Sequence, residues 1–205
     1  MKKTIGYLVK LILKKFNYRL VPDNFVIWPR QDEEFQKVFR GQASFGWKDQ
    51  SGPKSERMYK VYQLLELVKS VDGSWAECGV YKGATSFLLA TRMLQFGRKS
   101  SIFLFDSFQG LSSIETDDFG TFMKKSDYFC DIETVQSNLS GFEMLTYMPG
   151  WIPSRFEDVK AETFAFVHID VDLYDPVKQS LDFFMPRLAC GGMIVMDDYG
   201  FDGTP

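Results

Sequence analysis

The sequence predicts an α/β protein with a doubly wound, mostly parallel sheet, and three observations support this fold class. Two apolar runs, Phe164 to Ile169 and Met193 to Met196, are typical of strands buried on both faces. A segment with helical spacing separates them, which indicates a β-α-β unit. Earlier in the chain, residues 75–94 are expected to form a strand, a glycine turn and an apolar helix, the order found in nucleotide-binding folds.

The helix between the two apolar runs is predicted from its caps and its periodicity. Asp175 can cap its start, and Pro176 suits its first position. Gly191 and Gly192 are expected to stop it before the second strand. Its apolar positions recur at helical spacing and are Val177, Leu181, Phe184 and Leu188.

Acidic residues follow both strands of this unit. Because parallel strands run in the same direction, Asp170, Asp197 and Asp198 are expected to meet at the carboxyl edge of the sheet. Carboxylates gathered there repel one another unless a hard divalent cation such as Mg²⁺ binds among them. The alternative is that Asp197 or Asp198 merely ends a strand or caps a turn.

The glycine turn after residues 75–78 predicts the kind of cofactor. Gly79 and Gly83 let a ligand approach the backbone, and the following helix start, from Ala84 on, offers unpaired N–H groups. The spacing G-x-x-x-G lacks the dinucleotide fingerprint, and Glu77 would repel a pyrophosphate. An acid there favours a ligand with a cationic part, such as the ammonium and sulfonium of S-adenosylmethionine.

Two more strands are expected, at residues 101–105 and 144–148. Asp106 follows the first and could accept hydrogen bonds from both hydroxyls of a ribose, or cap a helix. Ser107 lies in the next loop, and residues 112–131 are expected to form a mobile insertion over the site. Trp151 follows the second strand and could stack on an adenine or pack in the core. A helix is expected at residues 132–139.

His168 is the only histidine of the chain. It lies two residues before Asp170 and therefore on the same side of its strand. It could act as a general base. The favoured interpretation is a core residue that orients a neighbour.

The composition indicates the size of the domain, the kind of partner and the cellular compartment. A chain of 205 residues, 45% hydrophobic and 16% aromatic, is long enough for a domain with a real core, and a net charge of -3 gives no reason to expect nucleic acid. Three widely spaced cysteines without a C-x-x-C pair indicate a reducing, cytoplasmic compartment without zinc, and all three are expected to be buried: Cys78, Cys130 and Cys190.

The amino-terminal part is divided from the rest at residue 54. Residues 1–20 have the pattern of a basic amphipathic helix, which could lie on an anionic membrane surface or pack on its own domain or a partner subunit. Residues 21–54 are broken by proline and glycine and are expected to form a lid or cap segment. A helix is expected to begin at Ser55, and residues 55–205 are expected to form the main domain.

Five motifs in order resemble the TylF/MycF-type O-methyltransferases, which methylate sugar hydroxyls on macrolides. The resemblance covers about Ser55 to Gly200 and rests on these motifs: E-C-G-V-Y-K-G at 77–83, F-D-S-F-Q-G-L at 105–111, G-W at 150–151, H-I-D-V-D-L-Y at 168–174, and P-R-L-A-C-G-G-M-I-V-M-D-D-Y at 186–199.

The resemblance implies a class I S-adenosylmethionine-dependent O-methyltransferase with bound Mg²⁺, which acts on a small-molecule or glycan substrate. The metal ligands would be Asp170, Asp197 and Asp198. Asp170, or else His168, would take the proton of the acceptor hydroxyl. The cofactor contacts would fall on these residues: Glu77, Gly79, Tyr81, Gly83, Ser86, Asp106, Ser107 and Trp151.

Class I methyltransferases generally have seven strands, whereas this sequence predicts five before Pro205. We therefore expect an exposed flank on the sheet, and three alternatives account for it: a natural truncation, a partner that covers the flank, or a chain that is a fragment. The alternative function is a remnant that binds S-adenosylmethionine or a partner without catalysis. A nicotinamide-dependent enzyme is disfavoured by the missing third glycine and by Glu77.

Overall fold

The computed structural model describes residues 28–42, 45, 52–113, 124–197 and 199. The predicted helix at residues 1–20 lies outside them. In chain order the elements are α2 Trp28–Gln31, α3 Glu33–Gly41, α4 Gly52–Leu67, β1 Ser74–Cys78, α5 Ala84–Gln95, β2 Ile102–Asp106, α6 Ile132–Asn138, β3 Leu145–Pro149, the 3-10 helix η3 Phe156–Val159, β4 Phe164–Ile169, α7 Tyr174–Phe184, the 3-10 helix η4 Met185–Arg187 and β5 Leu188–Met196.

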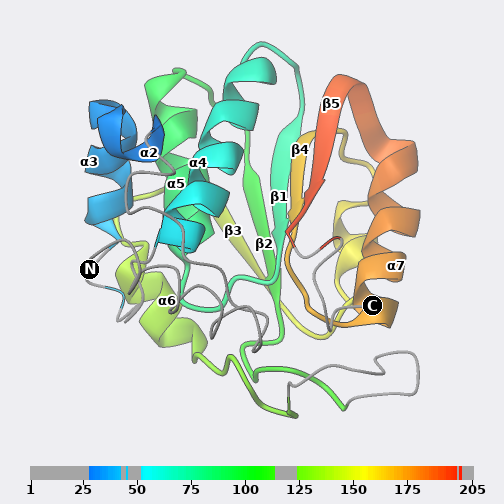
Figure 1. The fold of residues 1–205 in the computed structure, drawn as a ribbon. Coiled ribbons are helices and arrows are strands. Elements are labelled where there is room, and N and C mark those ends of the chain that lie inside the picture. The colour runs from blue at the N-terminus through cyan, green and yellow to red at the C-terminus, as the bar shows by residue number, and fades with distance from the viewer. Residues whose placement is uncertain (1–27, 43–44, 46–51, 114–123, 198, 200–205) are drawn as a thin grey trace, which may run out of the picture.

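The described strands form one parallel sheet in the order β3-β2-β1-β4-β5 (Figure 1). β1 and β4 are buried along their whole length, as the continuous apolar runs predict. The chain leaves β1 toward β2 on one side and later returns to β4 on the other. This topology confirms the predicted α/β doubly wound fold.

Helices cover both faces of the sheet. In Figure 1, α3, α4, α5 and α6 lie on one side and α7 on the other. The first face packs Trp75, Leu88 and Phe166 against the helices, and α3 adds Phe35 to the same core. The second face packs Ala76, Val167 and Phe184. The alternation of Trp75 with Ala76 follows from the strand period of two.

The predicted start and end of α7 are wrong. α7 begins at Tyr174 after Leu173, which gives no side-chain cap, so Asp175 lies inside the first turn. The helix ends at Phe184, because Pro186 in η4 lacks the N–H that a continuing α-helix needs. The glycine pair expected to stop the helix instead lies within β5.

Cysteine burial was predicted correctly in only two of three cases. Cys78 and Cys130 are buried, and Cys190 is exposed. Phe164 pairs with Leu188, whereas Phe166, two residues on, pairs with Met193, five residues on in β5. The extra residues of β5 bulge away from the ladder and carry Cys190 with them, which explains its exposure.

Candidate active site

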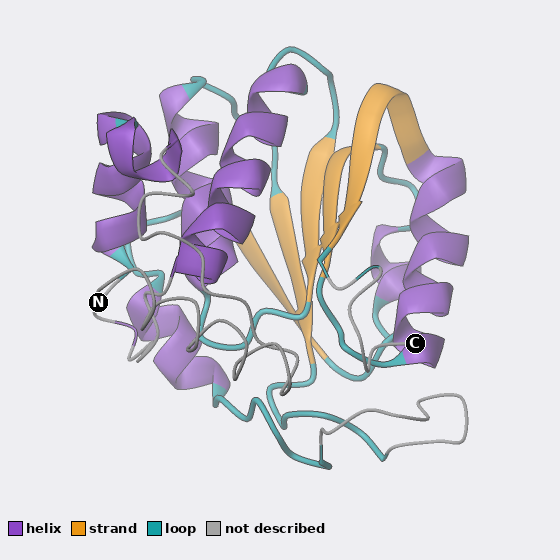
Figure 2. Cartoon of the chain, in the orientation of Figure 1, coloured by secondary structure: helices purple, strands orange, loops and turns teal. Residues whose placement is uncertain are grey.

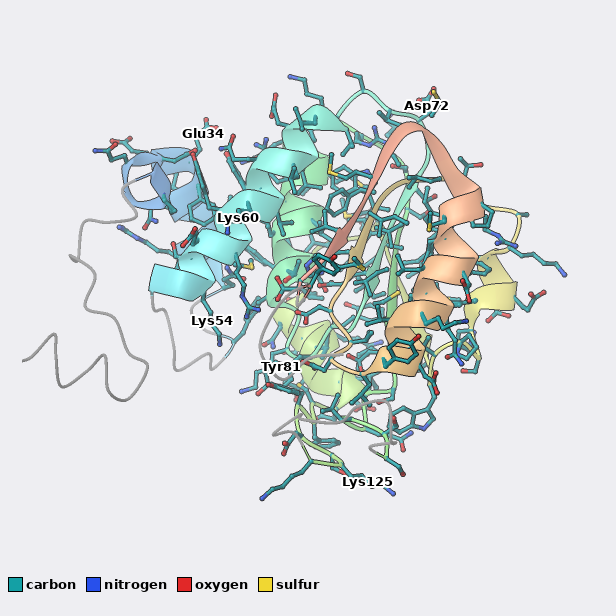
Figure 3. All side chains as sticks on the ribbon, turned by 45° about the vertical axis from the view of Figure 1, so that its right-hand side comes forward. Glu34, Lys54, Lys60, Asp72, Tyr81 and Lys125 are labelled. Carbon is teal, nitrogen blue, oxygen red and sulfur yellow. The ribbon has the colours of Figure 1, made fainter. Side chains whose placement is uncertain are left out.

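The candidate site lies at the carboxyl edge of the sheet, outside β1 and β4. Open α/β sheets bind ligands where the chain leaves two neighbouring strands in opposite directions, and β1 and β4 form such a pair here. Figure 2 shows this edge at the bottom of the strands, where loops and turns follow their arrowheads. In Figure 3, Tyr81 and Lys125 lie toward this edge, and Asp72, which precedes β1, lies at the opposite one.

Gly79 brings the turn after β1 against the end of β4. Its φ is +86°, and a Cβ built on it would lie 1.7 Å from the carbonyl oxygen of Asp170. Gly79 N–H also donates to the carbonyl of Phe105, and Asp170 N–H donates to that of Cys78. Only glycine allows this close approach, so Gly79 sets the spacing between the turn and the strand that carries Asp170.

Asp106 holds the β1–α5 turn to the end of β2. One carboxylate oxygen accepts hydrogen bonds from the N–H groups of Val80 and Tyr81, at 2.7 and 3.0 Å, and the other accepts from Phe108 at 2.7 Å. Tyr81 and Phe108 both have positive φ values, of 49° and 54°. The carboxylate thus stabilises two loop conformations that side-chain-bearing residues rarely adopt.

Glu77 lies beneath the turn and not at its surface. Its side chain is 1% exposed, and the Ser86 hydroxyl of α5 donates a hydrogen bond to it. Glu77 is paired in register with His168, whose Nδ1 lies 3.7 Å from the other Glu77 oxygen and makes no hydrogen bond. Both predicted site residues therefore belong to one buried polar cluster.

Burial shifts the pKa of both groups toward their neutral forms. It raises the pKa of Glu77 to about 8, although the hydrogen bond from Ser86 opposes the shift. It lowers the pKa of His168 to about 4. At neutral pH the contact is therefore between a carboxylic acid and a neutral imidazole, not an ion pair.

Asp197 follows β5 directly and forms an ion pair with α4. Its N–H donates to the carbonyl of Ile169, which places it beside the start of the Asp170 loop. Its Oδ2 lies 2.5 Å from Nη1 of Arg57. Asp198 lies outside the described residues, and among those residues no cluster of three or more His, Cys, Asp or Glu side chains is found.

Arg57 is a residue of this edge that the sequence does not predict, because it lies 140 positions before Asp197. A basic residue near a helix start gives no local signal of such a distant partner.

The remaining predicted site residues belong to the loops that follow β1, β2 and β3 at this edge. Gly83 has a φ of +85° and immediately precedes α5. The Ser107 hydroxyl donates to the carbonyl of Gly110 and shapes the loop after β2. Trp151, after β3, is 41% exposed, so it does not pack fully in the core. The ring of Tyr81 meets that of Tyr128 edge-on at 5.6 Å.

Residues 51–204 match the family model described as Macrocin-O-methyltransferase (TylF). The chain belongs to the TylF family. This match covers most of the chain and confirms the family resemblance that the five motifs indicate. Every strand of the described sheet lies inside the matched range.

Relatives of this TylF-family chain include O-methyltransferases of Streptomyces and Micromonospora. It is 26% identical over 147 residues to the 8-demethyl-8-(2,3-dimethoxy-alpha-L-rhamnosyl)-tetracenomycin-C 4'-O-methyltransferase of Streptomyces olivaceus, covering 66% of this chain and 56% of the relative. It is 28% identical over 160 residues to the mycinamicin III 3''-O-methyltransferase of Micromonospora griseorubida, covering 69% and 63%. The chain thus spans about three fifths of the length of these relatives.

Solved structures show the same fold. The O-methyltransferase NovP superposes with a TM-score of 0.61 at 25% identity, over 72% of this chain and 66% of that one. The calicheamicin methyltransferase CalS11 superposes with a TM-score of 0.65 at 15% identity, over 83% and 80%. The TylF-family chain therefore has the class I methyltransferase fold.

Proposed function

We propose that this protein transfers a methyl group from S-adenosylmethionine to a sugar hydroxyl of a glycosylated small molecule. The observation that carries the proposal is the family match over residues 51–204, which includes the complete β1 turn and the acids after β4 and β5. Two relatives are named for 4'-O-methylation of a rhamnosyl tetracenomycin and for 3''-O-methylation of mycinamicin III. A glycosylated natural product, or a surface polysaccharide precursor, is the corresponding acceptor.

The residues at the β1 turn suit this cofactor. Gly79 packs the turn directly on the end of β4, where a side chain would meet the Asp170 carbonyl, and so fixes the backbone that a cofactor would contact. Oδ2 of Asp106 already accepts two backbone hydrogen bonds, but Oδ1 accepts only one and can accept another, so a ribose hydroxyl remains compatible with its contacts. Glu77 supports the turn from below through Ser86. Tyr81, Gly83, Ser107 and Trp151 complete the proposed cofactor contacts.

Asp170, Asp197 and Asp198 are the residues that would hold Mg²⁺. The donor set suits a hard cation, and the Arg57 guanidinium on Asp197 indicates that this edge attracts positive charge. When bound, the ion would supply charge that lowers the pKa of an acceptor alcohol.

The proposed reaction is a direct displacement. The acceptor oxygen forms a bond to the methyl carbon as the carbon–sulfur bond breaks, and S-adenosylhomocysteine leaves with the electron pair. We assign the released proton to Asp170. His168 is 2% exposed and its Nδ1 faces Glu77, so we assign it a positioning role.

Location and assembly remain part of the proposal. We keep a cytoplasmic location, a peripheral membrane contact through residues 1–20 and a homo-oligomer as hypotheses. Among the helices that the structure describes, none combines the length and the apolar character needed to cross a bilayer.

The test combines cofactor binding with a transfer assay. The full chain is titrated with S-adenosylhomocysteine by calorimetry and then incubated with S-adenosylmethionine, Mg²⁺ and rhamnosides that have free hydroxyls. We expect binding, release of S-adenosylhomocysteine and a mass increase of one methyl group on the glycoside. Asp170→Asn should bind the cofactor and lose transfer. Binding without transfer across a broad set of glycosides would favour a non-catalytic remnant, and absence of binding would refute both functions.

A further inference from the structure

The ion pair between Arg57 and Asp197 lies directly at the proposed metal site. Arg57 is in the second turn of α4, where the next residue, Met58, is buried in the core and fixes the rotation of the helix. Its Nη1 reaches Oδ2 of Asp197 at 2.5 Å. The Asp197 side chain is 12% exposed and that of Arg57 38%. The Asp197 carboxylate is thus largely shielded from solvent, whereas the Arg57 side chain remains partly exposed to it.

This contact supplies the positive charge that the acids at this edge need. A largely buried carboxylate is unfavourable unless a cation neutralises it. Here the cation is a guanidinium that belongs to the chain itself and is anchored on a different element, α4. A divalent cation approaching Asp197 would meet this guanidinium at the same carboxylate.

We propose that Arg57 competes with the divalent cation for Asp197, so that metal binding displaces the guanidinium and Arg57 sets the metal affinity. The proposal rests on the metal part of the proposed function. Loss of Arg57 removes a repelling unit charge and frees a ligand oxygen. Two unit charges about 4 Å apart in water interact by about 1 kcal/mol, which corresponds to about fivefold in affinity, and the effect grows at a shielded site.

The test is a calorimetric titration of the full chain with Mg²⁺, repeated with Mn²⁺, at fixed ionic strength. We expect Arg57→Gln to bind either ion at least about fivefold more tightly than the wild type, and Arg57→Lys, which keeps the charge, to stay closer to the wild type. The matched control is Lys60→Gln. Lys60 lies one turn along the same helix and pairs with Glu56 at 3.3 Å in an exposed contact, so its loss changes net charge equally and should leave metal affinity unchanged.

Thermal unfolding gives a second readout that does not depend on activity. Without metal, Arg57→Gln leaves Asp197 without this partner and should unfold at a lower temperature. Saturating Mg²⁺ should raise its unfolding temperature more than that of the wild type, because stabilisation by a ligand increases with affinity. Far-UV circular dichroism before heating establishes that each variant is folded.

The outcomes separate this proposal from the proposed function. Equal or weaker metal binding by Arg57→Gln, with binding lost in Asp197→Asn, would overturn the competition and leave the metal site standing. An unchanged metal affinity in Asp197→Asn would overturn the metal assignment and the competition together. Absence of metal binding in the wild type and in Arg57→Gln would also overturn both, while S-adenosylmethionine binding could still support methyl transfer.

Discussion

The buried pair of Glu77 and His168 makes stability depend on pH in two opposite directions. The folded state keeps the Glu77 proton up to a pKa of about 8 instead of 4.5, so stability falls as pH rises between these values. In the folded state the pKa of His168 is about 4 instead of 6.5, so the folded protein binds fewer protons than the unfolded chain between these values and stability rises with pH there. The two effects oppose each other below pH 6.5. A net decline remains from about pH 6.5 to 8.

We expect Glu77→Gln to abolish this decline. The glutamine amide stays neutral at all these pH values, and its oxygen can still accept the hydrogen bond from Ser86. The measurement is the free energy of unfolding in urea at a series of pH values from 5 to 9. The exposed Glu157→Gln serves as control and should keep the wild-type profile. A decline that persists in Glu77→Gln would show that another group causes it.

Asp106 allows a prediction about the turn after β1. Asp106→Asn retains one acceptor oxygen, but its amide nitrogen faces backbone N–H groups that need an acceptor. We expect a loss of about 1–3 kcal/mol in the free energy of unfolding and weaker binding of S-adenosylhomocysteine. Urea unfolding and calorimetry measure the two effects. Unchanged cofactor affinity in a destabilised variant would restrict Asp106 to a structural role.

At the scale of elements, Gly79 decides how closely the β1 turn packs on β4. Gly79→Ala would place a methyl group on the Asp170 carbonyl, and because the atoms it meets there belong to the backbone of β4's end, no side-chain movement can relieve the clash. We expect a loss of about 4 kcal/mol or more in the free energy of unfolding. Gly97→Ala is the matched control, because Gly97 also has a positive φ, of +66°, but has nothing within 4 Å of a Cβ. It should lose only about 1–2 kcal/mol. Equal losses would refute the close-approach argument.

The elements also show what a sequence pattern can and cannot predict. Both ends of β4, Phe164 and Ile169, were predicted correctly, because a strand buried on both faces is apolar throughout. The start of β5 was missed, because Gly191 and Gly192 were interpreted as a helix stop. Gly192 passes so close to β4 that a Cβ would lie 3.0 Å from the Phe164 carbonyl oxygen. That requirement depends on a neighbouring strand and is invisible in the local sequence.

At the scale of the whole molecule, the acids at the sheet edge followed from topology alone. Parallel strands place Asp170 and Asp197 at one edge whatever their side chains contact, so their position at that edge was predictable. Their partners were not, because Arg57 reaches Asp197 from a helix that precedes the sheet. Similarly, Glu77 was expected to face a ligand, whereas its position within buried β1 directs it toward Ser86 and His168.

The two faces of the sheet are covered unequally, and this predicts where the molecule is most sensitive. Several helices share the first face in Figure 1, whereas the second depends on α7 and the short η3. Phe184 of α7 is fully buried, and its ring contacts those of Phe105, Phe156 and Phe164 with centroids 4.9 to 6.0 Å apart. One side chain thus joins α7 to η3, β2 and β4.

We expect Phe184→Ala to lower the free energy of unfolding by about 3–5 kcal/mol, because it removes the buried ring and leaves a cavity between α7 and the sheet. Met185→Ala is the control. Its side chain is the next in the chain and 64% exposed, so its loss should cost less than about 0.5 kcal/mol. Urea unfolding followed by circular dichroism measures both variants. A loss below about 1 kcal/mol in Phe184→Ala would mean that α7 is held mainly by other contacts, and the ring cluster would then not be what fixes α7 on this face of the sheet.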